Sequence, residues 1–198
     1  MSTEDKLYAF EAMVRAQLLS MERQPEGSEL RPGLVETPGR VSRMWLNELS
    51  YGYEVDVDAL FKTFDDHEDY EGMVIVKDIP VMSQCEHHLV PFIGYAHIGY
   101  LPKDKVVGLS KLPRLVDAYS RRLQIQERLT QQIHNKIVSE LEPRGAIVVI
   151  ECEHLCMTLR GVQKPGTTTV TSAVSGLYRD PAERAREEFF RLMRSRSN

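Results

Sequence analysis

Apolar residues recur at helical spacing along the first third of the chain. In residues 4–21 they fall three or four positions apart, as on one stripe of an amphipathic helix. That stripe consists of Leu7, Phe10, Met13, Val14 and Leu18. A second helix is predicted from residue 37, with Thr37 as N-cap and Pro38 at the first helical position, and a shorter one over residues 56–64. Residues 22–32 mix proline, glycine and charge and indicate a linker, so residues 1–71 are expected to form an N-terminal helical region.

From residue 72 the pattern changes to that of strands. Residues 73–79 and 93–100 are predicted strands, and residues 110–123 and 125–141 are predicted helices. Residues 146–151 are almost wholly apolar, as expected for a central strand, and residues 167–175 form an alternating β-branched strand. A closing helix begins after Asp180 and runs to about residue 194. The order strand–strand–helix–helix–strand–strand predicts an α+β fold, with residues 72–198 as its main domain.

Composition narrows the class of partner. The formal net charge of −4 gives no reason to expect a nucleic acid or an anionic membrane as partner, and no run approaches the roughly 20 apolar residues of a membrane span. Three cysteines, an odd number, and a start without a basic and apolar leader argue against a disulfide framework. The protein is therefore expected to be cytoplasmic.

Two clusters of metal-capable side chains lie about seventy residues apart. Cys85 and His88 stand at C-x-x-H spacing, and His154 and Cys156 form an H-x-C segment. Zinc favours such a mixture of sulfur and nitrogen ligands. Three ligands would leave an open position, as in a catalytic site, whereas all four would make a closed structural site. His87 favours the first alternative, because a closed site leaves it unexplained.

Cys152 complicates the second cluster. In an extended strand it faces the same way as residues 154 and 156. Because the other two cysteines already supply sulfur ligands, we expect Cys152 to be a buried structural thiol.

A separate group of residues fits an anionic ligand. Ser110, Lys111 and Arg114 place a hydroxyl and two cations in the first turn of a predicted helix, whose N-terminus itself favours phosphate. Arg160 and Lys164 follow the second cysteine cluster. A solvated basic face is the alternative, and we adopt it for Lys164.

Gln126 and Glu127 stand at another predicted helix start. Such pairs are usually solvated. A carboxylate there can, however, accept from the ring N–H and exocyclic amine of a guanine, while the amide meets the guanine carbonyl.

Several of these segments together resemble the GTP cyclohydrolase I family, from roughly residue 30 onward. The segments that carry the resemblance are Glu36-Thr37-Pro38-Gly39-Arg40-Val41, Cys85-Glu86-His87-His88-Leu89-Val90-Pro91-Phe92, Gly108-Leu109-Ser110-Lys111, Arg121-Arg122-Leu123-Gln124-Ile125-Gln126-Glu127-Arg128-Leu129, Glu153-His154-Leu155-Cys156-Met157-Thr158-Leu159-Arg160-Gly161-Val162, Lys164-Pro165-Gly166 and Thr169-Val170-Thr171-Ser172.

The resemblance implies an enzyme that hydrolyses GTP at purine C8, releases formate and forms 7,8-dihydroneopterin triphosphate, the first step towards pterins and folate or 7-deazaguanines. It implies zinc on Cys85, His88 and Cys156, with water in the fourth position. His87 would donate a proton to the purine imidazole nitrogen, and His154 would shuttle protons, tasks that suit a side chain titrating near neutral pH.

The resemblance also implies how the nucleotide is held. Glu127, with Gln126, would anchor the guanine. The triphosphate would be held by Ser110, Lys111, Arg114, Arg160 and Arg40.

In fold, the resemblance implies a tunnelling fold: a four-stranded antiparallel sheet with two helices on one face, plus the N-terminal helical extension. Family members assemble into toroidal barrels, commonly homodecamers, with active sites between subunits. Two rival interpretations remain: a zinc-stabilised structural oligomer, and another tunnelling-fold enzyme such as a nitrile reductase acting on a deazaguanine.

Overall fold

The structure, a computed structural model, describes residues 2–61, 63–64, 70 and 72–194. The chain divides into two compact units, Met1–Tyr51 and Gly52–Asn198. The domain boundary expected at residue 71 and most of the acidic turn before it lie outside the described residues.

The first unit is helical, as predicted. Helix α1 (Thr3–Met21) begins with a capping box, in which the Ser2 hydroxyl accepts from the Asp5 N–H at 3.1 Å and the Asp5 carboxylate accepts from the Ser2 N–H at 2.9 Å. It packs against α2 (Thr37–Arg43) through a stripe in which Val14 is buried, whereas Met13, expected on that stripe, is 53% exposed.

The remainder of this unit is less regular than expected. A 3₁₀ turn, η1 (Pro32–Leu34), precedes α2, and a π-helical stretch, η2 (Met44–Leu49), continues it. Glu36, not Thr37, occupies the cap position of α2 and makes no side-chain capping bond. The predicted Thr37 cap is therefore wrong, because the backbone is already helical at that residue.

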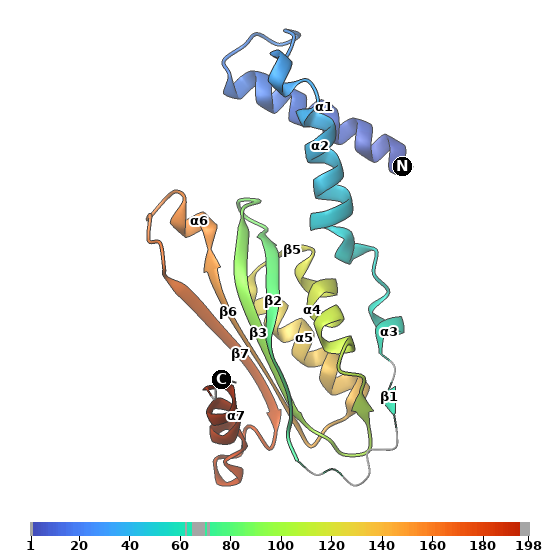
Figure 1. The fold of residues 1–198 in the computed structure, drawn as a ribbon, viewed down its shortest axis with the longest axis vertical. Helices are drawn as coiled ribbons and strands as arrows, with labels where there is room; N and C mark the ends of the chain where they lie inside the picture. Colours follow the sequence, from blue (N-terminus) through green and yellow to red (C-terminus); the bar gives the residue numbers. More distant parts are fainter. Residues whose placement is uncertain (1, 62, 65–69, 71, 195–198) are drawn as a thin grey trace. The chain divides into compact units, whose positions relative to one another are not determined.

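The second unit is built on a mixed five-stranded sheet in the order β5-β2-β3-β6-β7 (Figure 1). Strands β2 (Val74–Cys85), β3 (Pro91–Leu101), β6 (Gly145–His154) and β7 (Thr168–Gly176) are antiparallel neighbours, and the two-residue β5 (Leu123–Gln124) joins β2 in parallel. Before the sheet come η3 (Tyr51–Tyr53), α3 (Val57–Leu60) and β1 (Thr63–Phe64), which pairs with β4 (Val106–Val107). The predicted α+β class and its four main strands are confirmed.

Two helices cover one face of the sheet. Helices α4 (Lys111–Ser120) and α5 (Gln126–Leu141) bury side chains such as Leu115 and Ile133 against Phe92, Ile98 and Val148, all fully buried. The chain finishes with the 3₁₀ turn η4 (Pro181–Glu183) and helix α7 (Ala185–Arg194). Helix α7 packs on a second apolar cluster with Ile147 and Val149, which alternate with the first core along β6.

Strands β3 and β6 approach each other closely beside the site described below. Gly94 pairs with Cys152, and a Cβ at Gly94 would lie only 1.8 Å from the Glu151 carbonyl oxygen. Only glycine allows the two backbones this separation.

Candidate active site and metal centre

The two metal-capable clusters meet at one end of the sheet. Cys85 ends β2, and His154 ends β6 opposite Phe92 of β3. Cys156 follows in the short helix α6 (Leu155–Thr158), and α5 begins beside them at Gln126. A pocket of about 180 Å³ forms where these element ends converge.

Three side chains in this pocket form a metal-binding geometry. The ligand atoms of Cys85, His88 and Cys156 all lie within 4.8 Å of one another, and the Cys85 Sγ is 3.7 Å from the His88 Nδ1. In the described part of the chain neither His87 nor His154 belongs to that group. Two sulfurs and one imidazole are a ligand set that suits zinc and would leave one coordination position open, unlike the closed site of four protein ligands.

The two thiols influence each other. Burial, and next the neighbouring Cys85, raise the pKa of the Cys156 thiol, while Arg160 lowers it. A cation bound between the sulfurs would favour the thiolates, and its binding would then release protons. The Arg160 side chain itself is exposed.

The loop that carries the metal group is tied to α5 by an ion pair. Arg128 donates to both carboxylate oxygens of Glu86, at 2.6 and 2.9 Å. This bidentate contact lowers the pKa of Glu86. It holds together two segments forty residues apart, one with the metal group and the other with Glu127.

His154 is held on two sides. Its ring stacks on Phe92 at 4.8 Å between centroids and 10° between planes, and its Nε2 lies 2.7 Å from the Gln126 Oε1. Burial lowers the pKa of His154, and the nearby charge of Glu127 acts in the opposite direction. The imidazole is thus favoured in its neutral form.

The side chain of Gln126 is turned into the protein. Its side chain is 1% exposed and bonds inside the protein, to His154 at one end and to β6 and β7 at the other. Gln126, Glu127 and His87 all line the pocket, but only the last two of these three are exposed. The polar groups free to meet a ligand here are therefore carboxylate and imidazole.

Three of the expected phosphate-binding residues lie at the end of α4 away from this pocket. Ser110, Lys111 and Arg114 lie at the N-terminal end of α4, whose other end leads into β5 beside Cys85. The ten residues of α4 place these two ends about 15 Å apart. Arg40, in the first unit, forms an exposed ion pair with Glu36.

Sequence reasoning missed four residues that shape the pocket. They are Phe92, Arg128, Thr130 and Thr171. Phe92, Arg128 and Thr171 stand inside segments already singled out, so a search for partners of His154, Glu86 and Gln126 could have found them. Thr130 carries no local signal, because its role depends on packing α5 against β7. Cys152 is a buried thiol, as expected.

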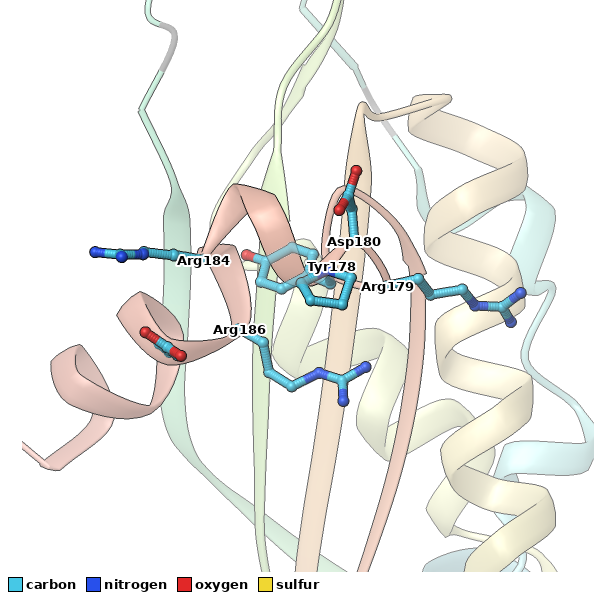
Figure 2. Close-up of a pocket in the computed structure, with 7 residues that line it drawn as sticks. Tyr178, Arg179, Asp180, Arg184 and Arg186 are labelled. Atoms are coloured by element: carbon cyan, nitrogen blue, oxygen red, sulfur yellow. The ribbon is translucent and has the colours of Figure 1, made fainter.

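A second hollow, of about 200 Å³, lies between the end of β7 and α7 (Figure 2). It is lined by Tyr178 and by the exposed Arg179, Arg184 and Arg186, with Asp180 among the cations. None of the residues expected to bind metal or substrate lies in it.

In the part of the chain that the structure describes, no helix is long and apolar enough to cross a membrane.

Comparison with known proteins supports the family resemblance of the sequence. The model of one protein family, GTP cyclohydrolase I, matches residues 10–194, beginning further upstream than residue 30. The GTP cyclohydrolase 1 of Streptomyces griseus is 55% identical over 177 residues, which cover 88% of this chain and 85% of the relative. That of Mycobacterium bovis is 50% identical over 186 residues, covering 93% and 89%. A crystal structure of the archaeosine synthase QueF-Like, 18% identical and with a TM-score of 0.46, covers 55% of this chain and 97% of its own, too weak a likeness to carry a conclusion. On the match over most of its length, the chain belongs to the GTP cyclohydrolase I family of hydrolases.

Proposed function

We propose that this protein hydrolyses GTP at purine C8, releasing formate and forming 7,8-dihydroneopterin triphosphate, with zinc at Cys85, His88 and Cys156. The observation that carries the proposal is the three-ligand group, which faces a pocket also lined by Glu127 and His154. A closed structural zinc site would need a fourth protein ligand within reach, and the described residues offer none in that group.

The donor set fits zinc. Two thiolates and one imidazole are soft and borderline ligands of the kind that select zinc over magnesium or calcium. When bound, the zinc ion supplies a Lewis acid and makes a water more acidic at neutral pH. Cys85 at the end of β2 and Cys156 in α6, just after β6, would hold the ion beside the pocket.

The remaining pocket residues divide the binding and proton steps. Glu127 accepts from the guanine N–H groups, and His87, exposed and 3.9 Å from the Cys85 Sγ at its Nδ1, donates a proton to the purine imidazole nitrogen. His154, oriented by Phe92, moves protons as the opened ring rearranges.

We further propose that the active site is shared between subunits of a homo-oligomer with the tunnelling fold, most simply a toroidal decamer. In this arrangement Ser110, Lys111 and Arg114 of one chain, with Arg160 and Arg40, bind the triphosphate of a nucleotide whose base lies at the Cys85 end of another. The separation of the two ends of α4 supports this arrangement. It also fits the triphosphate, whose roughly four negative charges require several cations to bind them. The three free cysteines fit a cytoplasmic setting.

The reaction is tested by incubating the zinc-loaded protein with GTP and measuring formate and, after oxidation, neopterin fluorescence. We expect product that disappears with chelator and returns with zinc. Cys85→Ser should lose zinc and activity, His87→Asn should keep zinc and lose activity, and Cys152→Ala, a cysteine outside the metal group, should keep its zinc. Product from fully metal-free protein would overturn the mechanism.

The shared site is tested by subunit complementation. Lys111→Ala and Cys85→Ser chains are each expected to be inactive. Co-expressed in one cell, they would form some sites in which both residues are intact, so activity should reappear. No recovery in isolated mixed oligomers would place the whole site within one chain.

A further inference from the structure

The buried amide of Gln126 has a single possible orientation. One end of the side chain lies 3.0 Å from the Ile150 carbonyl oxygen, 3.0 Å from the Thr169 carbonyl oxygen and 3.1 Å from the Thr171 hydroxyl. Backbone carbonyls only accept hydrogen bonds, so the atom beside them must be the NH₂ group. The amide oxygen therefore faces His154.

This orientation fixes the proton on His154. An amide oxygen only accepts, and it lies 2.7 Å from the Nε2 of the ring, so Nε2 carries a hydrogen. The other ring nitrogen, Nδ1, makes no hydrogen bond within the described part of the chain. In the neutral ring it is then the nitrogen with a free lone pair.

Two threonines complete the network and give it a direction. Thr130 donates to the Gln126 carbonyl oxygen at 2.8 Å, so its own oxygen, 2.7 Å from that of Thr171, accepts from Thr171. Thr171 in turn accepts from the Gln126 amide. All donors in this network have an acceptor, and Thr130 and Gln126 are each about 2% exposed or less. A fully satisfied buried network of this kind resists rearrangement.

We infer that Gln126 is a positioning residue, which holds His154 as the Nε2-protonated tautomer and reserves Nδ1 for proton exchange with the substrate. The inference rests on the proposed function for the substrate and for the use of the proton. It differs from the direct guanine contact expected for the Gln126 amide, because both N–H groups of that amide already face acceptors inside the protein.

The tautomer can be measured without turnover. In zinc-loaded protein labelled with ¹⁵N at histidine, or in a neutron structure, the neutral His154 ring is expected to carry hydrogen on Nε2 and none on Nδ1. The His154 signals are identified by their loss in a His154→Asn variant. Hydrogen on Nδ1 instead, or zinc bound to Nδ1, would overturn the inference, whether or not the protein acts on GTP.

The kinetic test separates positioning from substrate contact. Gln126→Met keeps the length of the side chain but loses both ends of the network, and we expect kcat to fall about 100-fold, the scale of general acid–base catalysis, with KM for GTP changed less than about threefold. Gln131→Met is the matched control, since Gln131 is exposed on the same helix and, among the described residues, its side chain bonds only to Asn135. A large rise in KM with kcat retained would overturn the inference and return Gln126 to the guanine.

A milder variant guards against misfolding. Thr171→Val removes one bond of the amide and leaves both carbonyls, so we expect a smaller fall in kcat that Thr171→Ser restores. Equal loss in both variants would contradict a role of the hydroxyl. A wild-type protein inactive on GTP but with the expected tautomer would refute the proposed function alone.

Discussion

A methyl group at Gly94 should be among the most damaging small changes in this protein. Gly94→Ala places its Cβ 1.8 Å from the Glu151 carbonyl oxygen and 2.7 Å from the Cys152 Cα, both backbone atoms that cannot rotate away. To reach even the 3.0 Å minimum of real Cβ contacts, β3 and β6 must separate locally by more than 1 Å. A ladder hydrogen bond of about 2.9 Å stretched by that amount is lost.

The cost follows from the bonds that open. Two or three ladder bonds at about 1 kcal/mol each, together with overpacking strain of about 1–3 kcal/mol, give a loss of about 3–6 kcal/mol in the free energy of unfolding. For a chain of this length each kcal/mol lowers Tm by about 2–4 °C, so we expect a fall of about 6–24 °C.

Thermal unfolding followed by circular dichroism, at equal protein concentrations because oligomers unfold in a concentration-dependent way, measures this fall. Gly39→Ala is the control: its Cβ meets only the side-chain ends of Arg43 and Glu11, at 3.2 and 3.3 Å, and alanine favours a helix. A Gly94→Ala protein whose Tm lies within about 2 °C of wild type would refute the reasoning from close strand approach.

Three further predictions concern buried groups. Burial lowers the pKa of His97 below its ordinary value of 6.5. The stability that the neutral His97 ring contributes is therefore complete above pH 6.5 and is lost as pH falls through the folded pKa. In urea titrations the His97→Gln variant should lose less stability than wild type between pH 7 and pH 5. Burial raises the pKa of Cys152 to about 12, so iodoacetamide should label Cys156 but not Cys152 in native metal-free protein, and mass spectrometry showing equal labelling would contradict this. In Gly99→Ala the new Cβ would lie 2.7 Å from the ring of Phe189, a side chain that can shift, so the free energy of unfolding should fall by about 1–3 kcal/mol and α7 should become more sensitive to protease. An unchanged cleavage rate would argue against this packing.

The element order was predictable because it depends on local periodicity, and the places where prediction failed are those where packing overrides it. Strand β2 was expected to end at residue 79 but continues to Cys85. Its last residues include Ser83 and Gln84, which are polar and nonetheless buried. The Ser83 hydroxyl donates to the Arg122 carbonyl oxygen. Buried polar side chains interrupt the alternation of apolar and polar residues, so this pattern does not predict the end of the strand.

The metal group was predictable from spacing, and the environment of Gln126 was not. The C-x-x-H spacing brings Cys85 and His88 together locally, and the fold adds Cys156 but not His154 to their group. The partners of Gln126 lie 24 to 45 residues away on β6 and β7, so only tertiary packing shows that its amide is turned inward. A side chain next to Glu127 in sequence thus has a different environment in space.

The cysteine–histidine loop owes its shape to bonds within the chain. The Cys85 N–H donates to the Val90 carbonyl at 3.0 Å, the Leu89 N–H returns to the Cys85 carbonyl at 2.8 Å, and Glu86 is clamped by Arg128. These bonds use backbone groups and the Glu86 carboxylate, so they leave the Cys85 thiol and the His88 imidazole available to an ion. We therefore expect removal of the ion to abolish activity without unfolding the loop, so that activity returns when the ion is added back.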